Sequence, residues 1–211
     1  MSATTASTSQ PATLADVLVP ARARSLVMDA ILVIAGAALT AIAAQLTFRA
    51  PWTDVPYTLQ TGAVLLVGTT LGLRRGALSM ALYVLVGAIG LPVFAEASSG
   101  LSRLFGYTGG YLFAFILAAA ATGWLAQRGW DRSAIGTLGL MATGTLIVYA
   151  IGVPVLAMSY ALPLGTAITS GAVVFLPWDI LKALVAAGLF PLAWQLTGRR
   201  RLTPRGWRPG A

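Results

Sequence analysis

The chain contains no cysteine and no histidine among its 211 residues. Without cysteine it has no disulfide, no thiolate nucleophile and no thiolate-held zinc or iron–sulfur cluster. Without histidine it has no Ser-His-Asp site, no HExxH zinc chemistry and no histidine proton relay. Its six acidic residues are too scattered to indicate a two-metal carboxylate site. The sequence therefore predicts neither an enzyme nor a bound metal or cofactor.

Charge is scarce as well. Only 9% of the residues are Asp, Glu, Lys or Arg, whereas soluble domains carry about 25%. Apolar residues make up 57% of the chain, above the roughly 45–50% of soluble domains. So few charged side chains do not cover a water-facing surface. The composition therefore predicts an integral membrane protein.

The apolar residues form runs of the length that crosses a membrane, for which a helix needs about 20 residues. The runs are 25–48, 58–73, 76–91, 108–126, 134–161 and 179–196. Residues 164–178 either extend the last span or form a short re-entrant piece, and their periodicity does not distinguish the two. We expect an all-α bundle of six transmembrane helices as one domain over residues 23–197. A disordered tail (1–22) and a basic tail (198–211) flank it.

The basic residues are distributed unevenly around these runs. If both termini are cytoplasmic, eleven of the fourteen lie inside, two (Arg49 and Arg103) lie outside and Lys182 lies within a span. The eleven are Arg22, Arg24, Arg74, Arg75, Arg128, Arg132, Arg199, Arg200, Arg201, Arg205 and Arg208. Cytoplasmic loops carry such an excess, and their arginines face anionic lipid. We therefore predict a multi-pass protein of the cytoplasmic membrane that contacts lipid and binds no nucleic acid.

Two ionisable residues, Asp179 and Lys182, fall within the last span. An ionisable side chain in hydrocarbon costs about 2.5 kcal/mol or more, so it usually faces a partner or a cavity. The two are three residues apart and share a helix face. Either they form a self-neutralising pair near the membrane surface, or they bind a ligand. One acceptor-only carboxylate beside one donor-only ammonium complements a neutral urea or amide.

Other polar residues are candidates for the same site. Arg103, in an outer loop, is either a solvated arginine or a clamp for an anionic group such as a carboxylate. Thr58 and Gln60 are polar groups at the start of the second run, where Thr58 is also a reasonable N-cap. Tyr111 lies near a span end, a position typical of an aromatic belt, and alternatively lines a pocket. Ala37 and Ala41, four residues apart in the first span, would allow a partner helix to approach closely.

The chain resembles the BioY family, the biotin-specific substrate-binding (S) components of energy-coupling-factor (ECF) transporters. The resemblance covers about residues 30–190. Its blocks are VPYTLQTGAVLLVGTTLGLRRGALSMALYVLVGAIGLPVFA (55–95), GLSRLFGYTGGYLFAFILAA (100–119), VYAIGVPVLAM (148–158) and FLPWDILKALVAA (175–187). Family members commonly have Gly-Pro-Thr-Gly-Gly where this chain has Tyr107 in place of the proline.

The resemblance implies a six-helix bundle of the S-component type in a bacterial cytoplasmic membrane. Biotin would bind near the outer face beneath a loop at 49–60, with Asp179 and Lys182 at its ureido ring and Arg103 near its carboxylate. Aromatic and aliphatic residues of 104–115 would form the walls. The partners would be a transmembrane coupling protein, contacted by small residues of the first helix, and ATPase subunits. The alternatives are a stand-alone secondary carrier for biotin and an S component for another small vitamin.

Overall fold

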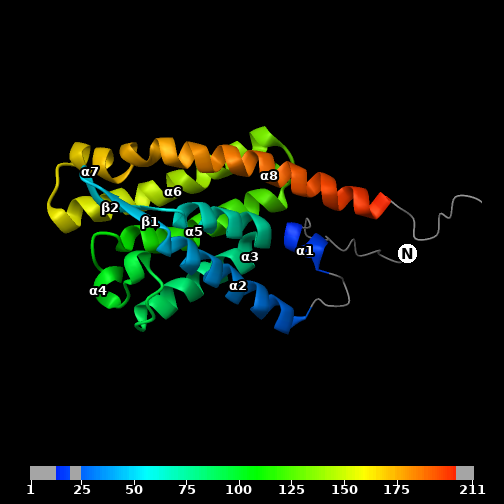
Figure 1. The fold of residues 1–211 in the computed structure, drawn as a ribbon, viewed down its shortest axis with the longest axis horizontal. Helices are drawn as coiled ribbons and strands as arrows, with labels where there is room; N and C mark the ends of the chain where they lie inside the picture. The colour runs from blue at the N-terminus through cyan, green and yellow to red at the C-terminus, as the bar shows by residue number, and fades with distance from the viewer. Residues whose placement is uncertain (1–12, 20–24, 203–211) are drawn as a thin grey trace, which may run out of the picture.

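The protein is described by a computed structural model that covers residues 13–19 and 25–202. Within this part of the chain, five stretches are long and apolar enough to cross a membrane. They are α2 (Leu26–Gln45), α3 (Gln60–Ala88), α5 (Gly109–Gln127), α6 (Ala134–Tyr160) and 164–197, which holds α7 (Leu164–Gly171) and most of α8 (Leu176–Leu202). The long helices form an elongated bundle in which α6 and α8 run side by side (Figure 1). The chain is thus a mostly helical protein with several candidate membrane spans.

Helix α3 folds back on itself at Gly72. This residue has φ 84° and ψ 176°, which no residue of a helix adopts. The side-chain amide nitrogen (Nε2) of Gln60 donates a hydrogen bond of 2.9 Å to the hydroxyl of Tyr83. A straight helix would hold these two residues about 35 Å apart, because it rises 1.5 Å per residue. α3 is therefore a helical hairpin whose turn lies just before the expected break at Arg74.

The turn of this hairpin packs backbone to backbone against α5. A Cβ atom added to Gly123 would lie 2.4 Å from the carbonyl carbon of Gly72 and 2.5 Å from the nitrogen of Leu73. Small residues such as Thr122 and Ala119, both fully buried, continue this face of α5. In the most apolar 18-residue stretch of α5, 67% is buried inside the protein, the largest share among the candidate spans. The small residues therefore make α5 the centre of the bundle.

Part of the expected disordered tail is folded. Residues Leu14–Leu18 form a short helix, α1, whose N-cap Thr13 accepts a hydrogen bond from the amide of Asp16. Leu14 and Ala15 are buried in the core of the protein. Arg75 donates to Asp16 at 2.7 Å and pairs with Asp29 of α2 at 2.7 Å. The expectation of disorder is wrong for α1, because Arg75 supplies a partner that the tail sequence does not reveal. Residues 1–12, 20–24 and 203–211 lie outside the described residues.

A small antiparallel hairpin of β1 (Thr47–Ala50) and β2 (Thr53–Thr58) follows α2. The sequence placed a loop at these positions. Tyr57 stacks on Phe48 with ring centroids 4.6 Å apart, and its hydroxyl donates to the carbonyl of Val174 at 2.8 Å. The indole nitrogen of Trp178 donates to the carbonyl of Thr58 at 3.1 Å. These contacts fasten the β hairpin to the region between α7 and α8.

Short elements complete the described chain. Residues 164–178 do not simply extend the last helix, because α7 is followed by a 3₁₀ turn, η4, and only then by α8. The remaining elements are η2 (Ala95–Ala97), α4 (Leu101–Leu104), η3 (Trp130–Arg132) and η4 (Val173–Phe175).

Substitution of Gly123 by alanine tests the packing of α5 against the α3 turn. The added methyl group meets backbone atoms that do not rotate away, so we expect a loss of stability of about 1–3 kcal/mol. The apparent melting temperature in detergent should fall by several degrees. Gly188→Ala in α8 is the matched control, since a Cβ there meets nothing within 4 Å. Equal melting temperatures for the two variants would contradict the proposed close approach.

Candidate ligand-binding site

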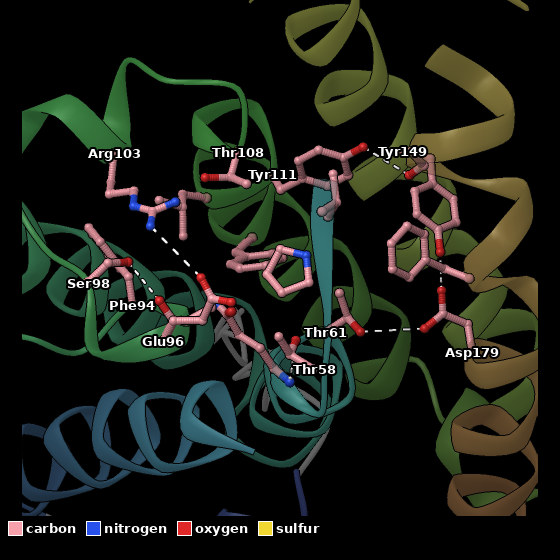
Figure 2. A pocket seen from close by; sticks show the side chains of 18 of the residues that line it. Thr58, Thr61, Phe94, Glu96, Ser98, Arg103, Thr108, Tyr111, Tyr149 and Asp179 are labelled. Carbon is pink, nitrogen blue, oxygen red and sulfur yellow. Dashed lines mark hydrogen bonds and ion pairs between the residues drawn. The ribbon is translucent and has the colours of Figure 1, made fainter. Parts of the chain in front are cut away.

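A cavity lies beneath the β hairpin (Figure 2). The β hairpin and α7 lie toward the end of the bundle away from α1 (Figure 1). The walls of the cavity come from β2, the start of α3, the 94–98 loop, α4, α5, α6, α7, η4 and α8. All six candidate ligand-binding residues from the sequence line it: Thr58, Gln60, Arg103, Tyr111, Asp179 and Lys182. The fold thus brings together groups that are up to 124 positions apart in the sequence.

One side of the cavity carries the Asp179–Lys182 pair. The ammonium of Lys182 lies 2.9 Å from Oδ1 of Asp179 and 2.6 Å from the hydroxyl of Thr61. Tyr149, from α6, donates a hydrogen bond to Oδ2 of Asp179. The side chains of Asp179 and Lys182 are only 10% and 14% exposed. Three helices therefore meet at one buried ion pair.

These contacts leave specific hydrogen-bonding capacity free for a ligand. An ammonium has three N–H donors, and among the described residues Lys182 uses two of them, for Thr61 and Asp179. Each carboxylate oxygen accepts two hydrogen bonds, and Oδ2 of Asp179 receives one, from Tyr149. This side of the cavity therefore offers one donor and one acceptor next to each other.

Arg103 lies on the other side of the cavity together with Glu96, as Figure 2 shows. Nη1 of Arg103 donates to the hydroxyl of Tyr107 at 3.2 Å, and Nη2 lies 3.9 Å from Oε2 of Glu96. Glu96 is also hydrogen-bonded through both carboxylate oxygens to Arg49 of β1. These hydrogen bonds from Arg49 hold the pKa of Glu96 below its usual range, so Glu96 is ionised at neutral pH. The cavity therefore has a second ionic end.

The surface between the two polar sides is largely apolar. Phe94, Leu112, Phe115 and Phe175 contribute to it, as does the ring of Tyr111. Tyr111 is 7% exposed, and its hydroxyl donates to the carbonyl of Gly171 at 2.9 Å. Tyr111 therefore lies in the cavity wall rather than in an aromatic belt facing lipid. The cavity suits a ligand with an apolar middle and two different polar ends.

Two of the residues expected at the site also hold its structure. The hydroxyl of Thr58 accepts a hydrogen bond from the backbone amide of Gln60 at 3.1 Å, but the N-cap of α3 is Leu59 rather than Thr58. The side chain of Gln60 is 95% buried and donates to Tyr83. Both line the cavity while they join β2 to the two segments of α3.

Three cavity residues that contact the charged candidates were not predicted from the sequence: Thr61, Tyr149 and Glu96. Tyr149 was the most detectable, because it is a polar group in the middle of an apolar span. Thr61 adjoins a residue already chosen, and Glu96 is one of only six acids. None of the three has a local spacing that points to Asp179 or Arg103, since each meets its partner only through the tertiary fold.

The small residues Ala37 and Ala41 do not form an open face for a partner. Ala37 is 6% exposed within the chain, and Ala41 is half-buried. On the same side of α2, a Cβ added to Gly36 would lie 2.6 Å from the hydroxyl of Ser79. The small-residue stripe therefore packs α2 against α3 of the same chain. This corrects the assignment of Ala37 to a partner interface, because the tertiary fold has already covered it.

The chain matches the BioY family over residues 10–199. It belongs to the BioY family. The biotin transporter BioY of Thermotoga maritima is 44% identical over 137 residues, 65% of this chain and 79% of the relative. BioY of Rhizobium etli is 36% identical over 63% of this chain and 74% of its own length. A probable biotin transporter BioY of Pyrococcus horikoshii is 38% identical over 71% of this chain and 85% of its own.

The fold is also similar to a solved structure. It matches the crystal structure at 2.1 Å of the S-component for biotin from an ECF-type ABC transporter, with a TM-score of 0.70 and 22% identity. The match covers 80% of this chain and 92% of the other. At this identity the likeness establishes the fold, and the BioY-family chain therefore has the fold of an S-component.

The ion pair in the cavity gives a stability test that needs no ligand. Asp179→Asn leaves the buried ammonium of Lys182 without its counter-charge, which costs about 3–5 kcal/mol in buried pairs. The double variant Asp179→Asn/Lys182→Met removes both charges and should melt at a higher temperature than Asp179→Asn alone. Asp54→Asn, on the exposed side of β2, is the control. A double variant less stable than the single variant would contradict this account of the pair.

Proposed function

We propose that this BioY-family protein binds biotin as the substrate-specific subunit of an ECF-type transporter in a bacterial cytoplasmic membrane. The observation that carries the proposal is the cavity with two unlike polar sides separated by apolar wall. Biotin has the same order of groups: a cyclic urea, a thioether ring with an aliphatic chain, and a carboxylate. Membership of a family whose relatives are named biotin transporters supports the same conclusion.

The urea ring is assigned to the Asp179 side. A urea offers N–H donors beside a C=O acceptor, and this side of the cavity offers an acceptor on Asp179 and a donor on Lys182. Both groups are buried, so water competes weakly for these hydrogen bonds, and the low dielectric strengthens them. Tyr149 and Thr61 fix the carboxylate in place, and the ligand then meets a preorganised pair.

The carboxylate is assigned to Arg103. A guanidinium grips a carboxylate through two parallel hydrogen bonds, and the contact of Arg103 with Glu96 is long at 3.9 Å. Arg103 therefore keeps donors for an incoming anion. Thr58, Gln60 and Tyr111 complete the proposed binding surface between the two ends.

We infer six spans with both termini in the cytoplasm. The spans are α2, the two segments of α3, α5, α6 and α8 preceded by α7. The excess of arginine supports this orientation, since Arg74, Arg75, Arg128 and Arg132 then all lie inside. α1 and the end of α8 lie at one end of the bundle, and the β hairpin and α7 at the other (Figure 1). The cavity then opens near the outer face.

The transporter model requires partners. The chain has no phosphate-binding loop for ATP, so a coupling protein and ATPase subunits would supply the energy. The small-residue stripe at Ala37 is covered, so a coupling helix would contact the exposed apolar face of α2. Side chains on that face include Ile31, Ile34, Leu39 and Ile42.

Titration calorimetry with biotin and biotin methyl ester tests the assigned orientation. Replacing Arg103 by glutamine should weaken biotin binding by about 10- to 100-fold, the usual weight of a charge-assisted hydrogen bond. The variant should bind the ester as well as the wild type does. Arg128→Gln is the matched control, because Arg128 stacks on Trp124 outside the cavity. An equal loss for both ligands would place the carboxylate elsewhere, and absence of biotin binding by the wild type would refute the function.

Proteoliposome uptake of labelled biotin tests the need for partners. We expect uptake only when a coupling protein, ATPase subunits and ATP are present, because the chain has no titratable relay suited to proton-driven transport. Protein reconstituted alone should bind biotin without accumulating it. Accumulation by the isolated protein would instead identify a stand-alone secondary carrier.

A further inference from the structure

The loop 93–98, which forms part of the cavity wall, is tied to the end of α2. The amide nitrogen of Gln45 donates to the carbonyls of Val93 at 3.3 Å and Phe94 at 3.1 Å. Its amide oxygen accepts a hydrogen bond of 3.0 Å from the nitrogen of Ala97. One side chain therefore holds both arms of the loop next to the β hairpin.

At the tip of this loop, the backbone is in a conformation that non-glycine residues rarely adopt. Glu96 has φ 60° and Ala97 has φ 51°, both in the left-handed region. Such residues persist when surrounding contacts hold them in place, and they cluster at binding sites. Here the conformation carries the carboxylate of Glu96 to the cavity wall, between two arginines from different parts of the chain.

The carboxylate of Glu96 serves both arginines. Its two oxygens receive the Nε and Nη2 groups of Arg49 in a two-point contact. The same Oε2 that meets Arg49 also lies 3.9 Å from Nη2 of Arg103. Arg49 belongs to the β hairpin, whereas Arg103 lies in α4 and lines the cavity. Glu96 thus links the cover of the cavity to the arginine assigned to the ligand.

Arg103 has a weaker anionic contact than Arg49 has. Glu96 contacts Arg49 through both of its oxygens and Arg103 only at 3.9 Å, and Asp54 of the hairpin lies near Arg49 as well. A ligand carboxylate on Arg103 would complete an alternating row of positive and negative charges. It would also repel Glu96 from Arg103 and leave it wholly to Arg49, with which it already makes the closer contact.

We propose that Glu96 is a positioning residue. Its ion pair with Arg49, called the latch below, holds the β hairpin closed over the cavity, and Glu96 leaves Arg103 free to bind the ligand's carboxylate. The ligand part of this proposal rests on the proposed binding of biotin, whereas the latch does not. An anionic end group then strengthens closure over the cavity, and a neutral analogue does not. The latch would slow dissociation rather than create affinity through direct contact.

The absence of cysteine allows the latch to be measured without ligand. Thr108 lines the cavity and makes no side-chain cap bond, so Thr108→Cys introduces a single reporter thiol. Its rate of reaction with a bulky maleimide in detergent reports opening of the hairpin. We expect Glu96→Gln and Arg49→Gln each to raise this rate about two- to fivefold, as befits a partly exposed ion pair. The double variant should react no faster than either single variant.

Salt separates an electrostatic latch from a merely structural role. In the wild type the labelling rate should rise with sodium chloride, because salt screens exposed ion pairs, while Glu96→Gln should show little dependence. The control is Asp29→Asn, which removes an acid from the partly exposed ion pair with Arg75 away from the cavity; it should behave as the wild type. Two outcomes would overturn the latch. One is a labelling rate of Glu96→Gln equal to that of the wild type, and the other is a rate increase in the double variant equal to the product of the two single increases.

Dissociation rates of biotin and its methyl ester complete the test. Glu96→Gln should release biotin faster and change release of the ester less, whereas equal acceleration would overturn the link to Arg103. The two proposals fail differently. If the wild type binds biotin but its labelling rate responds neither to salt nor to Glu96→Gln, the latch alone is refuted. Protein with the expected labelling pattern and no biotin binding refutes the function and, with it, the ligand part of this inference.

Discussion

An ion pair held inside an apolar bundle is the interaction on which the rest of this structure depends. Asp179 and Lys182 are nearly excluded from water, so each needs the other and each needs further hydrogen bonds. Those come from Thr61 on α3 and Tyr149 on α6. The pair therefore requires α3, α6 and α8 to be assembled in one arrangement. In that arrangement Asp179 can accept one further hydrogen bond and Lys182 can donate one. A urea has the complementary groups.

The two ends of the bundle are built on different principles. At the α1 end, glycines bring the α3 turn and α5 into backbone contact, and Arg75 joins α1 to α2. Such contacts leave little room for movement. At the cavity end, the β hairpin is held by aromatic stacking, a few hydrogen bonds and the exposed pair of Arg49 with Glu96. Exposed ion pairs are weak and screened by salt, which is consistent with the proposed opening of the β hairpin.

The cavity joins these two kinds of structure. Its buried side is fixed by the ion pair before any ligand arrives, which reduces the ordering cost of binding. Its outer side contains Arg103, whose contact with Glu96 is loose enough to be exchanged. A ligand with a urea at one end and a carboxylate at the other would therefore have a rigid polar pair at its buried end and an adjustable arginine at the entrance. The two sides differ in rigidity because the Asp179–Lys182 pair is shielded from water, whereas Arg103 and Glu96 are less buried.

The sequence by itself determined the class of protein, the apolar runs and the pair in the last span. Composition and charge decide these properties, because hydrocarbon tolerates few ionisable groups and arginine favours one side of the membrane. Only the tertiary structure decided that Tyr149 and Thr61 hold Asp179, that Glu96 lies between two arginines, and that Ala37 is covered. These contacts join residues far apart along the chain, and no local spacing encodes them. Folding of α1 onto Arg75 was hidden for the same reason.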